Sequence, residues 1–333
     1  MKYDVNISLA NQTKKEMVDY LETDNKQVLN KLGAFASLYE LDLKGYKNPV
    51  LVLKTEEPGS KQLLAVQYNK IEGVCYDMIN HLINDCIVMG STPLTVQDAI
   101  ICGKLDKDIV KRIVKTVAEA CRKQGCVLTG GETSEQPKVL NEGTYVLTAS
   151  VVGIVDKDNI IDGSKIKCGD VVIGVASSGL HTNGYTLVRK LMQENPEILN
   201  EKIDGKNFID VILEPHRCYY QAVKDLFTKK IISGMAHITG GGICENLNRI
   251  LPDNLNAEIN FKNYKILPIF NLIQNVGKVS DAEMLRTYNM GVGLTIVADK
   301  KFSSQIINHI KSFNMDCYII GEIKKGNKQV VLK

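Results

Sequence analysis

A run of three glycines in the second half of the chain is the segment best suited to binding an anion. Thr239-Gly240-Gly241-Gly242 follows a short apolar segment at 235–238, and a helical pattern continues after it. Glycines let backbone amides approach a ligand closely, and the first turn of a helix adds positive potential. His237, two residues before the run, is placed to donate a hydrogen bond to a phosphate or to move a proton. A flexible turn beside a structural histidine is the alternative interpretation.

A second polar loop, SSGLHTNG at 177–184, follows the apolar segment 171–176 and precedes another helical pattern. It concentrates hydroxyl, imidazole and amide groups, among them His181 and Asn183, between two glycines. Ligands of α/β proteins usually bind at the carboxyl ends of strands. The loop is therefore a candidate ligand loop, and a merely solvated loop is the alternative.

The segment TGGETSE at 129–135 places Glu132 beside Gly130 and Gly131. Carboxylates on a glycine turn can hold Mg²⁺ against phosphate oxygens. An exposed acidic turn without a ligand explains the same residues equally well.

A helical pattern over 73–89 carries a polar stripe of Asp77, His81 and Asn84, with Asp85 at its edge. Its carboxylates could serve magnesium. The alternative is a solvated helix face, since the opposite side of the pattern is apolar.

The common nucleotide signatures are absent from this sequence. It contains neither G-x-x-x-x-G-K-[ST] nor a G-x-G-x-x-G between a strand and a helix. A nucleotide would have to be held by other loops.

The hydrophobic pattern predicts strands and helices mixed along the whole chain, which is typical of an α/β or α+β fold. Predicted strands cover 48–55, 63–68, 145–155, 171–176, 235–238, 293–298 and 317–323. Predicted helices cover 73–89 and 107–124, begin near 185, and follow the glycine run through 250, while residues 1–32 form a polar, partly helical lead-in. The turn-rich segment 161–170 marks a boundary between domains 1–165 and 166–333.

Composition is that of an ordinary globular protein of about two domains. The 333 residues are 44% hydrophobic and 24% charged, and 41 basic against 38 acidic residues give a net charge of +3. This charge is too small and dispersed to indicate a nucleic-acid partner. No apolar run is long enough for a membrane span or a signal peptide, and the nine cysteines are best explained as small buried thiols. These features predict a cytoplasmic protein.

Five segments, read in order, resemble the aminoimidazole ribonucleotide synthetase (phosphoribosylformylglycinamidine cyclo-ligase) family. They are NDCIVMGSTPLTVQDAIICGKLD at 84–106, GGETSEQP at 130–137, SSGLHTNGYTLVRKL at 177–191, AHITGGGICENLNRILP at 236–252 and EMLRTYNMGVGL at 283–294. Their order and spacing cover nearly the whole chain and are far more specific than any single glycine motif.

The resemblance implies two domains and a homodimer. The N-terminal domain would have a mixed sheet with helices, bind ATP and dimerise through its sheet, and the C-terminal domain would be an α/β sandwich that binds the substrate phosphate. In the family's reaction, ATP activates the formyl-amide oxygen of formylglycinamidine ribonucleotide. A neighbouring nitrogen then closes the imidazole ring, and ADP and phosphate are released.

The resemblance also implies residue roles, with ATP and Mg²⁺ as cofactors. It assigns catalysis to His181, His237 and Glu132, and metal binding to Glu56, Asp85 and Glu132. It assigns nucleotide or phosphate binding to Glu56, Gly59, Ser60, Lys61, Asp85, Gly130, Gly131, Asn183, Gly240, Gly241 and Gly242. Which histidine has which role is left open.

Several N-terminal segments expected to handle ATP depart from the family pattern, among them the loop after the first predicted strand. The family's Asp-Gly-Val-Gly-Thr-Lys reads Glu56-Glu57-Pro58-Gly59-Ser60-Lys61 here. Glu57 adds bulk and negative charge near the expected phosphates, and Pro58 removes an amide donor. Two alternatives to the cyclo-ligase therefore stay open: a paralogue that binds a ribonucleotide without ATP turnover, and another ATP-dependent activity of the same superfamily.

Overall fold

The computed structural model describes residues 7–30 and 34–333. The chain divides into two compact units. The first unit comprises the residues up to Cys86 together with Ser91–Asp158, and the second comprises Ile87–Gly90 and Asn159–Lys333. None of the described helices is long and apolar enough to cross a membrane.

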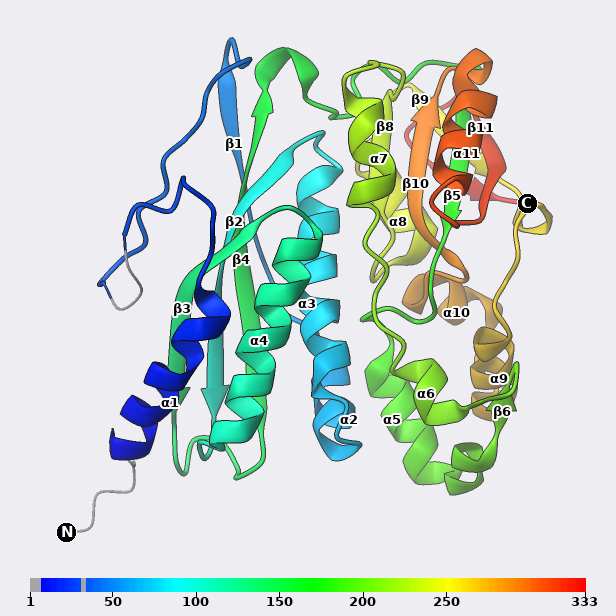
Figure 1. The fold of residues 1–333 in the computed structure, drawn as a ribbon. Coiled ribbons are helices and arrows are strands. Elements are labelled where there is room, and N and C mark those ends of the chain that lie inside the picture. Colours follow the sequence, from blue (N-terminus) through cyan, green and yellow to red (C-terminus); the bar gives the residue numbers. More distant parts are fainter. Residues whose placement is uncertain (1–6, 31–33) are drawn as a thin grey trace. The chain divides into compact units, whose positions relative to one another are not determined.

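The described part of the first unit contains one four-stranded mixed sheet with the strand order β1-β4-β2-β3. β4 pairs antiparallel with β1 and β2, and β2 pairs parallel with β3. Helices α3 and α4 cover one face of this sheet (Figure 1). The elements are α1 (Ile7–Leu21), β1 (Pro49–Glu56), α2 (Lys61–Gln67), α3 (Ile71–Ile87), β2 (Thr92–Cys102), α4 (Lys107–Lys123), β3 (Val127–Glu135) and β4 (Tyr145–Asp156).

Alternation along β1 decides which side chains face the helices. Val52, Lys54 and Glu56 are partly buried, whereas Leu51, Leu53 and Thr55 are exposed. Successive strand residues point to opposite faces, so Lys54 and Glu56 share one face of the sheet.

The strand predicted at 63–68 is wrong, because this segment lies in helix α2. Lys61, Gln62, Leu64 and Ala65 are buried and Leu63 is exposed, which is helical spacing. A short apolar run of Leu, Ala, Val and Gln is compatible with both structures, and Leu, Ala and Gln favour the helix.

The predicted glycine turn at 129–135 is also wrong. The segment belongs to strand β3, which pairs with β2 over its length. Parallel pairing with a neighbouring strand overrides the local turn preference of two glycines.

The described part of the second unit contains a six-stranded sheet of order β12-β9-β11-β5-β10-β8 and a two-stranded ribbon of β6 and β7. β5 pairs antiparallel with β10 and β11, and β10 pairs antiparallel with β8. The strands are β5 (Val171–Ala176), β6 (Lys202–Ile203), β7 (Lys206–Asn207), β8 (Gly234–His237), β9 (Leu255–Ile259), β10 (Val292–Ala298), β11 (Cys317–Lys325) and β12 (Val330–Leu332). The helices are α5 (Tyr185–Glu194), α6 (Phe208–Ile212), α7 (Tyr220–Phe227), α8 (Gly242–Asn248), α9 (Pro268–Gly277), α10 (Asp281–Thr287) and α11 (Ser303–Lys311).

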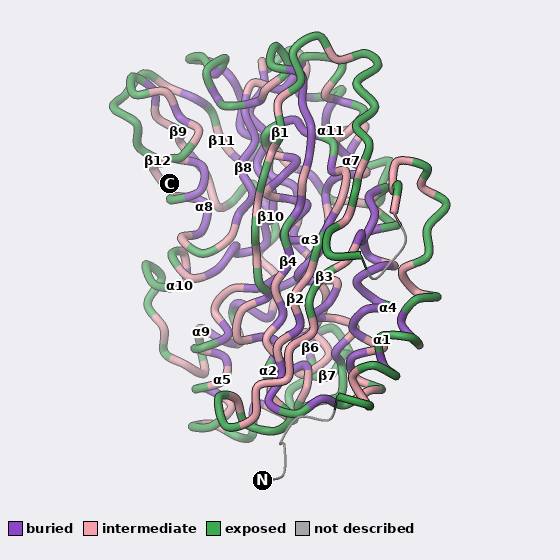
Figure 2. Tube along the Cα trace, turned by 90° about the vertical axis from the view of Figure 1, so that its left-hand side faces the viewer, coloured by how far each residue is buried: buried purple, intermediate pink, exposed green. Residues whose placement is uncertain are grey.

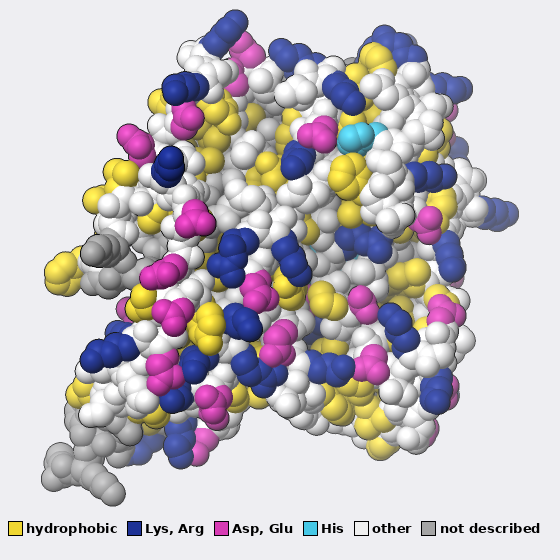
Figure 3. All heavy atoms as spheres, viewed as in Figure 1, with side chains coloured by type: hydrophobic (Ala, Val, Ile, Leu, Met, Phe, Trp, Pro, Cys, Tyr) yellow, Lys and Arg dark blue, Asp and Glu magenta, His cyan; other side chains and the backbone are white. Residues whose placement is uncertain are grey.

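The central strands of the second unit form its core. All residues of β10 are buried (Figure 2). β5 is buried except at its last residue. Their continuous apolar sequences are typical of strands covered on both faces. Lys, Arg, Asp and Glu side chains are mixed on the face drawn in Figure 3.

Candidate functional site

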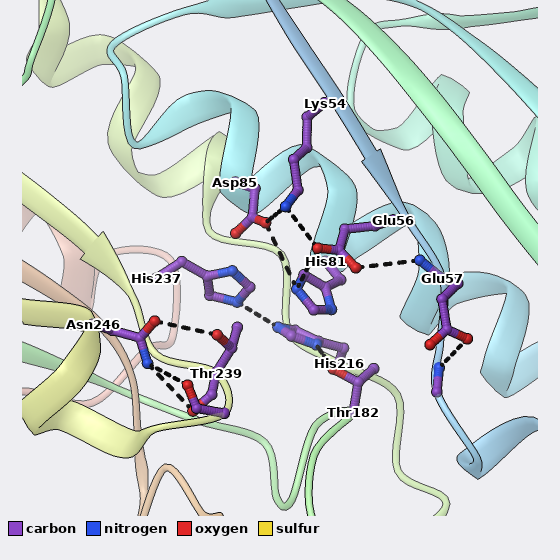
Figure 4. Close-up of polar contacts among 12 residues, drawn as sticks. Lys54, Glu56, Glu57, His81, Asp85, Thr182, His216, His237, Thr239 and Asn246 are labelled. Atoms are coloured by element: carbon purple, nitrogen blue, oxygen red, sulfur yellow. Dashed lines mark hydrogen bonds and ion pairs between the residues drawn. The ribbon is translucent and has the colours of Figure 1, made fainter. Parts of the chain in front are cut away.

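In the first unit, β1 and α3 bring four charged or ionisable side chains together. We call Lys54, Glu56, His81 and Asp85 the carboxylate cluster (Figure 4). Lys54 Nζ lies 2.7 Å from Glu56 Oε1 and 3.0 Å from Asp85 Oδ2. His81 Nε2 lies 3.7 Å and 3.8 Å from the same two oxygens. His81 and Asp85 are one helical turn apart on α3, so both face β1.

Glu56 and Asp85, two of the predicted metal ligands, thus converge, but the cation between them is the Lys54 ammonium. Burial by itself would lower the pKa of Lys54, and hydrogen bonds to Glu56 and Asp85 outweigh it, so the pKa is raised above its usual value. The ammonium is therefore charged at neutral pH and neutralises half of the charge of the two carboxylates. In this arrangement the two carboxylates do not fit a Mg²⁺ ion, which needs oxygen ligands at about 2.0–2.1 Å.

The loop after β1 satisfies its amides with its own carboxylates. Glu57 N donates to Glu56 Oε2 at 3.2 Å, and Gly59 N donates to Glu57 Oε2 at 2.9 Å (Figure 4). Gly59 has a φ of +68°, and Ser60 forms the N-cap position of α2 without a side-chain hydrogen bond to the helix. The loop 57–60 is therefore closed on itself.

Lys61 lies inside the first unit. Its Nζ is 2.9 Å from Asp77 Oδ1 and 2.8 Å from Oδ2, and the two side chains are 1% and 0% exposed. The polar stripe of α3 is accordingly not a solvated helix face, since Asp77, His81 and Asn84 are all buried.

Asp98 on β2, which the sequence analysis missed, carries a buried carboxyl oxygen. Burial raises the pKa of its carboxyl to about 7. The residue is partly exposed, but its Oδ2 is buried and has no hydrogen-bond partner among the described residues. A Cβ at Gly131 would lie 1.9 Å from Asp98 Oδ1, so the glycine makes room for this carboxyl.

Glu132 lies apart from the carboxylate cluster. Across the sheet, Glu56 pairs with Ala149, Ala149 with Asp98, and Asp98 with Gly131. Glu56 and Gly131 are thus separated by three strand spacings, about 14 Å, and Glu132 follows Gly131 and points to the opposite face. Glu132 is exposed, and its Oε1 accepts a hydrogen bond from Thr133 N at 2.9 Å. Glu56 and Glu132 therefore would not ligate the same ion.

In the second unit, three buried histidines form what we call the histidine cluster: His181, His216 and His237. His216 Nε2 lies 2.8 Å from His237 Nε2 (Figure 4). The rings of His181 and His216 stack with centroids 3.8 Å apart. At 2.8 Å one Nε2 must donate and the other accept, so the tautomers of His216 and His237 are coupled.

His181 folds back onto its own loop. It has a φ of +61°, and its Nε2 accepts a hydrogen bond from Ser178 N at 3.1 Å. The neutral ring then carries its proton on Nδ1. A Cβ at Gly293 of β10 would lie 2.6 Å from His181 Cε1, so this glycine lets the ring approach the sheet.

Strand pairing explains why the two predicted ligand loops of this unit meet. β10 pairs with β5 and β8, placing Val292 opposite Ala176 and Leu294 opposite His237. The carboxyl ends of β5 and β8 therefore lie at the same edge, with one strand between them. Loops 177–184 and 239–242 both leave the sheet there, and a Cβ at Gly240 would lie 3.2 Å from Asn183 Nδ2.

The glycine run is held in shape by Asn246 of α8. Its Nδ2 donates to Gly240 O at 3.1 Å and to Gly242 O at 2.8 Å. Its Oδ1 accepts a hydrogen bond from Thr239 Oγ1 (Figure 4). Gly241 and Gly242 have φ values of +92° and +61°, and a Cβ at Gly242 would lie 1.9 Å from Leu285 O. Glycine is thus required by both conformation and space, and the loop is a defined turn rather than a flexible one.

A cavity of about 390 Å³ opens beside the loop 177–184. Residues 176–179, Arg217 and Lys265 line it, together with Glu214 and Asp316. This volume is in the range of small-molecule sites, and the lining offers charged groups of both signs.

Four residues of these sites were missed by the sequence analysis: Lys54, Asp98, His216 and Asn246. Lys54 lies on the predicted strand 48–55 and Glu56 directly follows that strand, so their two-residue spacing was a usable signal of a shared face. His216 gave no local signal, because the contact with His237 depends on the fold.

Two proteins that are similar over the full length of the chain carry the same name. A protein from Caldanaerobacter subterraneus subsp. tengcongensis is 41% identical over 339 residues, covering 100% of both chains. One from Clostridium acetobutylicum is 41% identical, covering 99% of this chain and 98% of the other. Both are named phosphoribosylformylglycinamidine cyclo-ligase.

Solved structures share the fold at low sequence identity. The hydrogenase maturation protein HypE in complex with ATP aligns with a TM-score of 0.71 and 15% identity, covering 97% of this chain and 90% of that chain. Thiamine-monophosphate kinase from Stenotrophomonas maltophilia aligns with a TM-score of 0.68 and 14% identity, covering 99% and 96%.

Family models match both halves of the chain. The model described as AIR synthase related protein, N-terminal domain, matches residues 41–155, and the one described as its C-terminal domain matches residues 167–333. The chain therefore belongs to the AIR synthase related protein family.

Proposed function

We propose that this protein is a phosphoribosylformylglycinamidine cyclo-ligase, an ATP-dependent ligase of purine biosynthesis. It closes the imidazole ring of formylglycinamidine ribonucleotide to give aminoimidazole ribonucleotide, ADP and phosphate. Membership of the family over the full length supports this function. Within the structure, the observation that carries it is the histidine cluster beside two ordered ligand loops.

The second unit would bind the ribonucleotide. Asn246 presets the shape of the Gly240–Gly242 turn. Gly241 N and Gly242 N already donate to Arg286 O and Thr239 O, so the amide of this turn that would meet an anion is that of Gly240. Asn183 lies against Gly240 and adds a side-chain amide to the same place. The neighbouring cavity, with Arg217 and Lys265, has room for the remainder of a small phosphorylated ligand.

His237 and His216 would handle the proton that ring closure releases. The attacking nitrogen loses a proton when it bonds to the activated carbon, and a neutral imidazole is a suitable acceptor near neutral pH. The Nε2–Nε2 contact lets His216 fix which tautomer His237 presents. His181, whose Nε2 is engaged by Ser178, would position the loop and its ligand.

The first unit would bind ATP, which transfers its terminal phosphoryl group to the formyl oxygen. Phosphoryl transfer depends on positioning and on charge stabilisation. Lys54 supplies a fixed positive charge, and Lys61 supports the fold of α2 and α3 through Asp77. Mg²⁺ would arrive with the phosphates of the nucleotide, because Lys54 already occupies the position between Glu56 and Asp85.

The protein would form a homodimer through the outer face of the sheet of the first unit, where apolar side chains are exposed. Leu51 and Leu53 of β1 are 50% and 69% exposed on the face away from the helices. Apolar side chains of an edge strand that remain exposed are suited to burial against a partner.

A specific observation also favours the ribonucleotide-binding paralogue without ATP turnover. The loop 57–60 is closed by its own carboxylates, and Lys61 is buried away from solvent. ADP release separates the two functions, since only the ligase makes ADP in a reaction that requires the ribonucleotide.

The test is turnover of formylglycinamidine ribonucleotide with ATP and Mg²⁺, followed as ADP release and aminoimidazole ribonucleotide formation. The wild type should form both in equal amounts. His237→Asn should lose about 10²-fold or more in kcat, the usual contribution of a proton-transferring side chain. His309→Asn on α11 is the matched control, because His309 belongs to neither cluster. Equal activity of the wild type and His237→Asn would contradict the assignment.

A further inference from the structure

The carboxylate cluster contains a cation that is part of the chain. Lys54 Nζ bridges one oxygen of Glu56 and one of Asp85 at 2.7 Å and 3.0 Å. Both distances are those of charge-assisted hydrogen bonds. Its position follows from strand geometry, since Lys54 and Glu56 are two residues apart on β1 and face α3 together.

We propose that the Lys54 ammonium is the resident cation of the Glu56–Asp85 pair and keeps a divalent metal ion from binding there. The inference refines the nucleotide side of the proposed function, and it rests on that function only for Mg²⁺ as the competing ion.

Charge and space both support this assignment. Two carboxylates near one position would attract a divalent ion, but one ammonium already neutralises half of their charge and lies between the ligating oxygens. An ion placed there would also lie within a few ångströms of the Lys54 charge and be repelled by it. His81 Nε2, 3.7–3.8 Å from the same oxygens, fills the helix side of the cluster.

In the adjoining loop, a side-chain carboxylate takes the place expected for a phosphate. Gly59 N, an amide in the segment expected to meet phosphates, donates to the carboxylate of Glu57 at 2.9 Å. Within residues 54–61 the chain thus provides its own cation for the carboxylates and its own anion for the amide. Nucleotide binding at this loop would require Glu57 to leave, whereas Lys54 can remain as a counter-charge for phosphate.

The experiment is titration of the full-length protein with Mn²⁺ alone, without nucleotide, reading free Mn²⁺ by its electron paramagnetic resonance signal. Lys54→Met removes the ammonium and leaves a side chain of similar length on the edge strand. We expect its affinity for Mn²⁺ to exceed that of the wild type by at least about tenfold. Lys54→Arg retains a charge that can bridge two carboxylates, so it should bind Mn²⁺ as weakly as the wild type.

Two controls locate the effect. Lys104→Met removes the same charge from an exposed ion pair with Glu142 in the same unit, and should leave Mn²⁺ affinity unchanged. Adding Glu56→Gln to Lys54→Met should abolish the gain. Circular dichroism of each variant shows that it is folded, and Lys54→Thr replaces Lys54→Met if the latter is not.

Equal Mn²⁺ affinity of the wild type and Lys54→Met would overturn the proposal, as would a gain that persists after Glu56→Gln. Neither result depends on catalysis. A wild type that fails to turn over the ribonucleotide would count against the proposed function and leave the metal titration as it stands.

Discussion

Replacing Lys61 tests whether this residue stabilises the fold or binds phosphate. Lys61 and Asp77 are 1% and 0% exposed, and the ammonium contacts both carboxylate oxygens at 2.8–2.9 Å. Removing one partner of a buried ion pair leaves the other charge buried, at a cost of about 3–5 kcal/mol. For a unit of roughly 150 residues, 1 kcal/mol shifts the Tm by about 2–4 °C. Lys61→Met should therefore lower the Tm of the first unit by roughly 6–20 °C.

The assay is differential scanning calorimetry of the full chain, with nucleotide binding measured on the same samples below the transition. Lys61→Met/Asp77→Leu should recover most of the lost stability, because an apolar pair of similar volume replaces the ion pair without leaving a buried charge. Lys104→Met breaks an exposed pair with Glu142 and should change stability by less than about 1 kcal/mol. If Lys61→Met melts with the wild type but no longer binds an ATP analogue, Lys61 is a phosphate ligand and the argument from burial is refuted.

Three further substitutions test other features of the sites. Burial in the folded protein raises the pKa of Asp98 to about 7, so ionisation of this carboxyl destabilises the native state as pH rises from about 4 to 7. Asp98→Asn should therefore match the stability of the wild type near pH 4 and be more stable by up to about 4 kcal/mol at pH 8. A Tm difference between the two proteins that is independent of pH would contradict this. Gly242→Ala should destabilise the second unit and weaken ribonucleotide binding, because the added Cβ would clash with Leu285 O. Gly205 has a similar φ of +79° but open space around it, so Gly205→Ala should lower the free energy of unfolding by only about 1–2 kcal/mol. Equal losses of Tm in the two variants would refute the packing argument. His216→Phe keeps a ring beside His181 but loses the hydrogen bond to His237. The kcat should therefore fall at least about tenfold, with a shifted pH–rate profile. An unchanged profile would exclude a role for His216 in setting the tautomer of His237.

Most elements of the fold could be predicted from the sequence, because their patterns agree with their tertiary surroundings. The continuous apolar run at 171–176 and the amphipathic segment at 107–124 correspond to β5 and α4. The strand predicted at 63–68 was wrong because such a short, mostly apolar run does not distinguish the spacing of a strand from that of a helix. Burial of Lys61 and Leu64 favours the helix α2 in the folded protein.

The candidate site was predictable in part. The loops that contain His181 and the glycine run could be found, since a polar loop after an apolar strand is a local signal. Their proximity follows from the pairing of β10 with both β5 and β8, which a single sequence does not reveal. The same holds for the contacts of His216 with His237 and of Lys54 with Asp85, which join residues of different elements.

The central claim is that ATP activates the formyl oxygen of the ribonucleotide, and transfer of an oxygen label tests it most directly. Formylglycinamidine ribonucleotide carrying ¹⁸O in its formyl group is turned over with unlabelled ATP, and the released phosphate is examined by mass spectrometry. If the formyl oxygen is phosphorylated and then leaves with the phosphoryl group, one ¹⁸O should appear in each phosphate, with one aminoimidazole ribonucleotide formed per ADP. Ribonucleotide binding without ADP release, or ADP release with unlabelled phosphate, would contradict the account.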